Sequence, residues 1–184
     1  TGVRRGGVCL GEDINEPYPA VEQQEMIVRK CLDVLRLHGF PVHIVTGSSG
    51  VLRDLDLLKT IASNAGCLVT VTLPTHERKL AMALDPDGPE PSERFDLVRR
   101  LREEGLHAGV GIIPMIPYAL RPSGVREIYR RSRQVGASYV IDRPLTLLEE
   151  RRDEFISALS SSTQLKRFAQ RLGRMYAKRT APYG

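Results

Sequence analysis

The stretch from Pro41 to Leu58, Pro-Val-His-Ile-Val-Thr-Gly-Ser-Ser-Gly-Val-Leu-Arg-Asp-Leu-Asp-Leu-Leu, contains a strand, a loop and the start of a helix. Its β-branched run is followed by a small polar loop with the hydroxyls of Thr46, Ser48 and Ser49, and then by leucines at helical spacing. This order is typical of a βα unit in a parallel sheet, where ligands bind at the carboxyl ends of the strands. The hydroxyls are therefore expected either to lie at a functional edge or to cap the helix and close the turn.

Similar alternations of apolar runs and amphipathic segments fill the chain as far as residue 145. The expected strands are 7–10, 42–45, 67–73, 107–115 and 137–141, and the expected helices are 20–38, 51–64, 76–84, 92–104 and 125–135. Strands separated by helices imply right-handed crossovers and a parallel sheet. We predict an α/β fold with about five parallel strands and flanking helices. Five strands cannot close an eight-stranded barrel, so the sheet is either open and doubly wound or part of a barrel. The run 67–73 is nearly all apolar or β-branched, as expected for a strand covered on both faces.

The segment 20–38 is expected to form one long helix that ends at Gly39. Its predicted inward stripe consists of Ile27, Cys31, Val34, Leu35 and His38. Cys31, Cys9 and Cys67 are odd in number, widely spaced and set among apolar residues. They are expected to be buried free thiols of a reducing compartment, because they lack any metal-binding spacing.

Composition limits the class of protein. A length of 184 residues with 41% hydrophobic content suits one domain with a real core. No run approaches the roughly 20 apolar residues of a membrane span, and the N-terminus lacks the apolar stretch of a secretory signal. We therefore expect a cytoplasmic protein that does not enter a membrane.

The net charge of +5 permits contact with nucleic acid, and the basic excess is concentrated near the C-terminus. Residues 146–184 are expected to be a helical extension to the fold of residues 1–145. Its basic residues are Lys166, Arg167, Arg171, Arg174, Lys178 and Arg179. They indicate either a surface for nucleic acid or the solvated face of a docked terminal helix.

Several segments follow one another in a distinctive order. These are Gly11-Glu-Asp-Ile-Asn-Glu-Pro-Tyr-Pro19, Thr46 to Leu58 with its Val-Leu-Arg-Asp-Leu-Asp element, the strand at 69–72 with the proline-rich loop 83–94, and Pro114-Met-Ile-Pro117. Together they resemble radical S-adenosylmethionine proteins of the spore photoproduct lyase-like, or DNA repair photolyase-like, group. The likeness covers roughly residues 7 to 145.

The resemblance implies a partial (β/α)6 barrel, similar to a TIM barrel, that lacks its first βα unit and binds S-adenosylmethionine at the carboxyl ends of its strands. In the family, a [4Fe–4S] cluster cleaves the sulfonium to give a 5′-deoxyadenosyl radical. Carried over by position, Glu12, Asp13 and Ser48 would face the methionyl end of the cofactor. Thr72 would help to hold its carboxylate at a strand end shared with Thr46. The remaining positions are Pro114 and Ile116, against the adenine, and Arg143, at the end of the fifth strand.

The sequence also departs from the family. The cluster-binding Cys-x-x-x-Cys-x-x-Cys motif is absent, so we expect no cluster on this chain alone. Gly47 stands where the family has a lysine, and Asp87 where it has an arginine. A lysine at position 47 would place a cation beside the strand end and is expected to tighten cofactor binding.

Two interpretations remain open at this point. One is a piece of a longer radical S-adenosylmethionine protein whose first βα unit is lacking. The other is a diverged α/β module without that chemistry, whose basic tail binds nucleic acid. Among the histidines, His76 alone follows the carboxyl end of an expected strand, whereas His43 is expected to be a satisfied histidine on a strand face.

Overall fold

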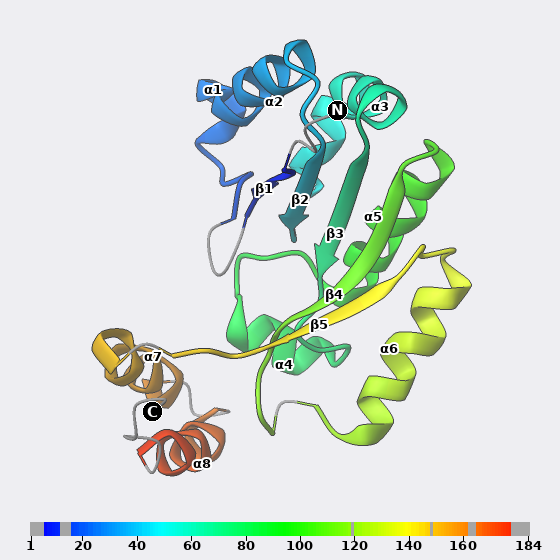
Figure 1. Ribbon diagram of the computed structural model, residues 1–184. Helices are drawn as coiled ribbons and strands as arrows, with labels where there is room; N and C mark the ends of the chain where they lie inside the picture. Colours follow the sequence, from blue (N-terminus) through cyan, green and yellow to red (C-terminus); the bar gives the residue numbers. More distant parts are fainter. Residues whose placement is uncertain (1–5, 12–15, 119, 148, 162–164, 178–184) are drawn as a thin grey trace.

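The computed structural model describes residues 6–11, 16–118, 120–147, 149–161 and 165–177. Five parallel strands form one sheet (Figure 1). The strands are β1 (Val8–Leu10), β2 (Val42–Thr46), β3 (Cys67–Thr72), β4 (His107–Met115) and β5 (Val140–Pro144). The helices are α1 (Glu22–Glu25), α2 (Ile27–Leu37), the 3-10 helix η1 (Ser49–Asp54), α3 (Leu55–Asn64), α4 (Arg78–Leu84), α5 (Pro91–Glu103), α6 (Pro122–Gln134), α7 (Glu149–Ser161) and α8 (Lys166–Ala177).

The strands lie in the order β1-β2-β3-β4-β5, so each strand is beside the next one in the chain. The predicted α/β class is confirmed. Within the described chain the order has no reversal, which a doubly wound sheet would require. Consecutive parallel strands joined by crossovers of one hand place their helices on the same face. This singly wound arrangement is the one found in barrels, although the described strands form an open sheet.

The core lies between that face of the sheet and helices α2, α3, α5 and α6. Alternate strand residues point into it because side chains along a strand alternate between faces. The buried strand residues of this core are Val42, Ile44, Cys67, Val69, Val71, Ala108, Val110 and Ile112. On the opposite face, Leu68 is 42% exposed and Ile141 is 37% exposed. The prediction that the third strand is covered on both faces is therefore wrong at Leu68.

A row of hydrogen-bonded side chains crosses the opposite face. Nε2 of His43 lies 2.7 Å from Oγ1 of Thr70, which lies 3.0 Å from the hydroxyl of Tyr139. Tyr139 reaches across β4 because Gly109 has no side chain there; an added Cβ would overlap the tyrosine ring. The prediction that His43 is a satisfied strand-face histidine is confirmed.

The expected helix 20–38 is interrupted. Met26 adopts a left-handed conformation with φ of 52° and separates α1 from α2. The carboxylate of Glu22 accepts hydrogen bonds from the backbone N–H groups of Ile27 and Val28, both at 2.9 Å, and so satisfies the first turn of α2. A single helix was predicted because the apolar spacing continues through the break.

The predicted inward stripe of this helix is confirmed only at Leu35 and is otherwise wrong. Leu32 is fully buried, with Val28 and Leu35 packed beside it. Ile27 and Val34 are 57% and 55% exposed, and Cys31 is exposed between them. The segment contains two apolar stripes at i, i+4, i+7 spacing, and spacing alone does not determine which of them faces the sheet.

Two other boundaries differ from the prediction. The helix expected from residue 51 starts as the 3-10 helix η1 before α3 begins. The fifth strand runs over Val140–Pro144 rather than 137–141, because the turn at Gly136, with φ of 73°, is followed by a bend at Ser138 before the regular register with β4 starts at Val140. Arg143 consequently lies within β5.

Helices α7 and α8 form a second hydrophobic cluster, separate from the main core. They pack against Ile116 and Leu145, and the hydroxyl of Tyr176 donates a hydrogen bond of 2.5 Å to the carbonyl oxygen of Leu145. On α8 the basic residues Lys166, Arg167, Arg171 and Arg174 are exposed, while Ala169 and Leu172 are buried. The predicted docked helix with a solvated basic face is confirmed to this extent; Lys178 and Arg179 lie outside the described residues.

None of the helices in the described part of the chain combines the length and the apolar run needed to cross a membrane.

Candidate functional site

The carboxyl end of β2 holds an oriented carboxylate. Glu16 accepts hydrogen bonds from the backbone N–H groups of Gly47 at 2.8 Å and Tyr18 at 3.0 Å. The Thr46 hydroxyl also donates to it and accepts from the N–H of Ser48 at 2.9 Å. Glu16 is nevertheless exposed. Its carboxylate is therefore fixed in direction while it stays open to a ligand.

Of the two roles expected for the loop hydroxyls, a functional edge or a helix cap, Ser48 has the second. It is the N-cap of η1, and its hydroxyl accepts a hydrogen bond of 3.1 Å from the N–H of Gly50. Its side chain thus closes the turn next to the strand end.

The neighbouring strand end, at Thr72 of β3, holds a guanidinium. Nη1 of Arg94, from α5, donates to the carbonyl oxygen of Thr72 at 2.9 Å and to its hydroxyl at 3.1 Å. Nη2 forms an ion pair of 2.9 Å with Asp85, and Nε donates to the carbonyl oxygen of Pro89 at 3.0 Å. Burial lowers the pKa of Arg94, against the opposing effect of Asp85 and Glu16. Arg94 therefore connects the proline-rich loop to the end of β3.

Gly47 lies directly beneath this guanidinium. A Cβ atom at position 47 would overlap Nη1 of Arg94 and lie 3.0 Å from Oγ1 of Thr72. The strand end therefore does not lack a cation, as the missing lysine suggested, because Arg94 occupies that place. A lysine at position 47 would have to displace Arg94.

The Arg-Asp-Leu-Asp element of the anchor stretch supports this site from behind. Asp54 is fully buried and accepts hydrogen bonds from the Tyr18 hydroxyl at 3.1 Å, from Nη1 of Arg29 at 3.1 Å and from Nη2 of Arg53 at 2.9 Å. Burial raises the pKa of Tyr18, and Asp54 raises it further. Tyr18 thus remains a neutral donor that anchors the loop two residues after Glu16.

Arg53 extends the same network to α1. It donates to the carboxylate of Glu22 at 2.9 Å and to the carbonyl oxygen of Glu22 at 2.8 Å. Arg29 also forms an ion pair of 2.7 Å with Asp56. The most specific motif of the resemblance is therefore structural: it holds α1, α2 and the Glu16 loop against the end of β2.

The other predicted site residues do not belong to this group of strand-end side chains. Glu12 and Asp13 lie outside the described residues. Pro114 follows a cis peptide bond near the end of β4. The side chain of Ile116 is 4% exposed and packs in the second cluster, so α7 and α8 cover it. Arg143 is partly buried in β5.

Glu16 and Arg94 are not among the site residues that the sequence predicts. In the loop 11–19 the predicted residues are Glu12 and Asp13, and in the proline-rich loop the comparison with the family concerns Asp87 rather than Arg94. Their places in the sequence are the only signal that could have pointed to them. Glu16 precedes Pro-Tyr in the first loop, and Arg94 lies one turn into a helix that begins with proline.

His76 lies near α6 and is not among the residues bonded to Glu16 or Arg94. A Cβ added to Gly124 would lie 2.8 Å from Cε1 of His76, so the ring packs against the first turn of α6. Its Nδ1 atom is buried and has no hydrogen-bond partner among the described residues.

The three thiols lie on three different elements. Cys9 is partly buried in β1, Cys31 is exposed on α2, and Cys67 is buried in the core, where burial raises its pKa to about 12. Within the described ranges no three histidine, cysteine or acidic side chains are grouped as metal ligands. The cysteines described here do not fit a cluster.

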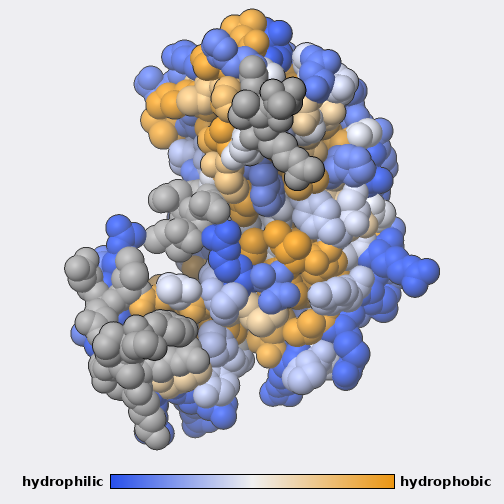
Figure 2. Space-filling model, viewed as in Figure 1, coloured by the Kyte–Doolittle hydropathy of each residue, from blue (hydrophilic) through white to orange (hydrophobic). Residues whose placement is uncertain are grey.

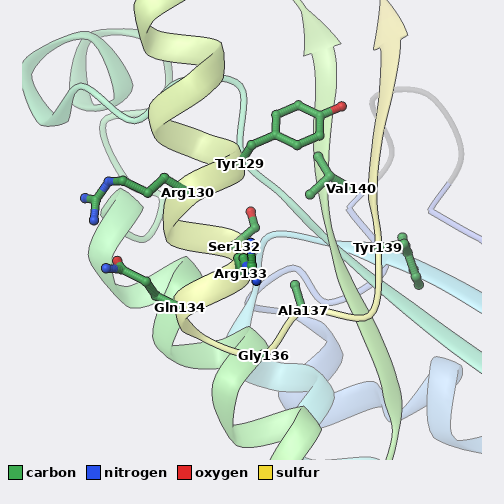
Figure 3. Close-up of a pocket in the computed structure, with 9 residues that line it drawn as sticks. All are labelled: Tyr129, Arg130, Ser132, Arg133, Gln134, Gly136, Ala137, Tyr139 and Val140. Atoms are coloured by element: carbon green, nitrogen blue, oxygen red, sulfur yellow. The ribbon is translucent and has the colours of Figure 1, made fainter.

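Two surface hollows, each of about 890 Å³, are lined by neither Glu16 nor Thr72 nor Arg94. One lies between α6 and the start of β5, where the Tyr129 ring extends toward the strands while Arg130 and Gln134 point outward (Figure 3). The other lies between α4 and α7 and is lined by Met82, Phe155 and Leu159 among others. The candidate site is thus a set of strand-end groups rather than a closed pocket.

Comparison with known proteins gives relatives but no established family. The chain is 31% identical over 123 residues to the uncharacterized protein ORF301 of Acidianus two-tailed virus, an alignment covering 67% of this chain and 38% of that protein. It is 28% identical over 114 residues to the uncharacterized protein Rv2578c of Mycobacterium tuberculosis, which covers 62% and 33%. Identity to the uncharacterized protein MJ0683 of Methanocaldococcus jannaschii is 29% over 111 residues, covering 60% and 41%. No family model and no solved structure matches, and the chain spans between 33% and 41% of these relatives' lengths.

Proposed function

We propose that this chain is part of a radical S-adenosylmethionine core and binds that cofactor at the carboxyl ends of β2 and β3. The observation that carries the proposal is the pair of opposite charges at adjacent strand ends. Glu16 offers a fixed, exposed carboxylate, and the hydroxyl of Thr72 lies at the neighbouring strand end beside the guanidinium of Arg94, which is buried and paired with Asp85. The methionyl end of S-adenosylmethionine carries an ammonium, which Glu16 would bind, and a carboxylate, which would accept a hydrogen bond from Thr72 on the side of the guanidinium.

The singly wound sheet supports the same proposal at the level of the fold. Helices on one face and a row of small and polar side chains on the other are typical of a segment of a (β/α) barrel. When bound, the cofactor and a [4Fe–4S] cluster would supply radical chemistry. The thiolates of that cluster would have to come from outside this chain, because its own cysteines do not fit one.

Titration calorimetry with S-adenosylmethionine tests the proposal. The wild-type chain should bind, and Glu16→Gln should lose roughly 10- to 150-fold in affinity, because one charge-assisted hydrogen bond is worth about 1.5–3 kcal/mol. Glu103→Gln, an exposed change on α5, is the matched control and should bind as wild type does.

A second ligand localises the effect. 5′-Methylthioadenosine lacks the α-amino and carboxyl groups of the methionyl end, so Glu16→Gln should leave the affinity for this ligand unchanged. Failure of the wild-type chain to bind S-adenosylmethionine, or equal binding by Glu16→Gln, would exclude this site.

The basic face of α8 supports a second candidate function, binding to nucleic acid. Four exposed cations lie on a helix whose other face is fixed to the end of the sheet. If they contact phosphates, the logarithm of the affinity for an oligonucleotide should fall linearly with the logarithm of salt concentration. Replacing Lys166 and Arg167 by glutamine should reduce that slope by about 2, following about 0.9 per phosphate contact on duplex DNA. Absence of binding at low salt would remove this candidate.

A further inference from the structure

The outer face of α6 carries a stripe of arginines around one tyrosine. Arg126, Tyr129, Arg130 and Arg133 are exposed and follow one another at i, i+3, i+4 and i+7, so they share one side of the helix. We call these four residues the α6 stripe. α6 lies at the right-hand margin of the molecule in Figure 1, and Figure 2 shows strongly hydrophilic residues over it. The stripe is therefore open to a partner from solvent.

The charge of the α6 stripe is only partly balanced. Glu127 accepts two hydrogen bonds from Arg130, of 2.8 Å from Nε and 2.6 Å from Nη2. The side chains of Arg126 and Arg133 have no hydrogen-bond or ion-pair partner among the described residues. These two cations are seven positions apart, roughly 10 Å along a helix that rises about 1.5 Å per residue. They remain available to anionic groups of a partner at that spacing.

The hollow of about 890 Å³ between α6 and β5 opens beside the stripe. Tyr129, Ala137 and Tyr139 are among its walls, and the Tyr129 ring extends toward the strands rather than away from them (Figure 3). The hydroxyl of Ser132, another wall residue, donates a hydrogen bond of 2.7 Å to the carbonyl oxygen of Ile128 and is thereby satisfied. The hollow therefore suits an apolar side chain better than a polar one.

Contacts from other elements hold the walls of the hollow in place. The Tyr139 hydroxyl lies 3.0 Å from Oγ1 of Thr70, across β4. Arg102 of α5 donates to the carbonyl oxygen of Gly136 at 2.9 Å and to that of Leu106 at 2.7 Å, and so fixes the turn between α6 and β5. A surface whose shape exists before binding loses little conformational entropy when a partner binds.

We propose that the α6 stripe and this hollow form a docking surface for an acidic amphipathic helix of a partner protein. Two carboxylates of that helix, two turns apart, pair with Arg126 and Arg133, and a large apolar side chain between them enters the hollow beside Tyr129. Tyrosine and arginine are the residues enriched at protein interfaces, and a helix laid on a groove is a common mode of recognition. This docking is independent of the cofactor proposed for the ends of β2 and β3.

The spacing of the two arginines favours a helix over other partners. Residues seven positions apart on a helix point to the same side and match the roughly 10 Å between Arg126 and Arg133. Side chains on one face of a strand repeat every 6.6 Å or so, and neither one nor two such repeats match. A nucleic acid would bring a continuous row of phosphates past the carboxylate of Glu127, which repels them.

Fluorescence anisotropy with a synthetic peptide tests the proposal. The probe is a labelled helical peptide of about 15 residues, with two glutamates seven positions apart and one leucine between them on the same face. The wild-type chain should bind it at low salt. The double variant Arg126→Gln, Arg133→Gln should bind roughly 2- to 30-fold more weakly, as expected from two exposed ion pairs. The double variant Arg99→Gln, Arg100→Gln removes the same charge from exposed positions of α5 and should bind as wild type does.

A second pair of changes tests the hollow. Replacing the leucine of the peptide by alanine should weaken binding to the wild-type chain roughly 10-fold, because apolar surface is no longer buried. The same replacement should have little further effect on binding to Tyr129→Ala, since side chains in contact are not additive.

Four results would overturn the proposal. The first is no binding of the peptide by the wild-type chain, and the second is an equal loss in both double variants. The third comes from a single-stranded oligonucleotide measured in parallel: if the double variant of α6 loses affinity for it but keeps the peptide, the arginines bind phosphates. The fourth is self-association in light scattering that this double variant abolishes, which would identify a second copy of the chain as the partner.

Discussion

Gly47 is a glycine because the guanidinium of Arg94 lies where its side chain would begin. The backbone N–H of Gly47 also donates to Glu16, so this residue touches both charged groups of the candidate site. At the scale of single residues, the site depends on the absence of a side chain as much as on the polar groups around it.

Gly47→Ala should consequently be destabilising. Overpacking of this kind costs about 1–3 kcal/mol, because Arg94 must leave either Thr72 or Asp85 to make room for a methyl group. Urea unfolding measures the change. Gly6→Ala, where an added Cβ meets nothing within 4 Å, is the control and should be neutral. Unaltered stability of Gly47→Ala would show that Arg94 does not occupy this position in solution.

Glu22 combines burial with charge. Burial works against its ionised form, but hydrogen bonds from Arg53 and from the N–H groups of Val28 and Ile27 outweigh this effect and lower the pKa. A carboxyl whose pKa is lower in the folded state than in the unfolded state adds stability above its ordinary pKa, about 4.3 for glutamate. That stability is lost as the pH falls through the lowered value.

We expect Glu22→Gln to cost about 2 kcal/mol at pH 7, within the range of charged hydrogen bonds removed from buried sites. The difference from wild type should shrink as the pH falls below about 4. Unfolding curves at pH 7, 4 and 3 measure it, with the exposed Glu25→Gln on the same helix as control. A difference that stays constant over this range would mean that the charge of Glu22 contributes nothing.

At the scale of elements, the start of α5 positions Arg94. Pro91 occupies the first turn, and Glu90 and Glu93 form a reciprocal capping box in which the N–H of Glu90 donates to Glu93 at 2.7 Å. Arg94 follows directly, so the cap determines where its guanidinium reaches the end of β3.

Glu93→Ala should destabilise the protein by about 1 kcal/mol, the usual effect of losing a cap. It should also weaken S-adenosylmethionine binding if Arg94 is part of that site. Glu103→Ala, near the other end of α5, is the control. Thermal unfolding combined with calorimetry checks both effects, and a stable variant with unchanged affinity would separate the cap from the site.

At the scale of the whole molecule, two clusters share the chain. The main core joins the sheet to α2, α3, α5 and α6, and the second joins α7 and α8 to Ile116 and Leu145. Each cluster can therefore unfold locally while the other stays folded, because the residues that unfold together are those packed against one another.

Leu172→Ala, in the second cluster, should cost about 2–5 kcal/mol of local stability. Hydrogen exchange followed by mass spectrometry should show faster exchange in α7 and α8, with β2 and β3 unchanged. The exposed Arg174→Ala, two residues away, should alter neither region. Equal acceleration in the sheet would mean that the chain unfolds as one unit.

The sequence by itself determined the α/β class, the number of strands and the span of β4, because a buried parallel strand is a continuous apolar run that few other structures tolerate. It also determined that polar groups gather after β2 and β3. Local sequence patterns sufficed for these features, since a strand run or a polar loop depends on residues that are neighbours along the chain.

The tertiary structure alone decided which of two equivalent stripes of α2 faces the sheet, and that Cys31 is exposed rather than buried. It alone brought Arg94 to Gly47, residues far apart in sequence, and so supplied a cation at the strand end where position 47 has no lysine. The physical reason is common to both. Spacing along the chain specifies which residues share a face, but the partner of that face is fixed only when distant segments pack and exclude water.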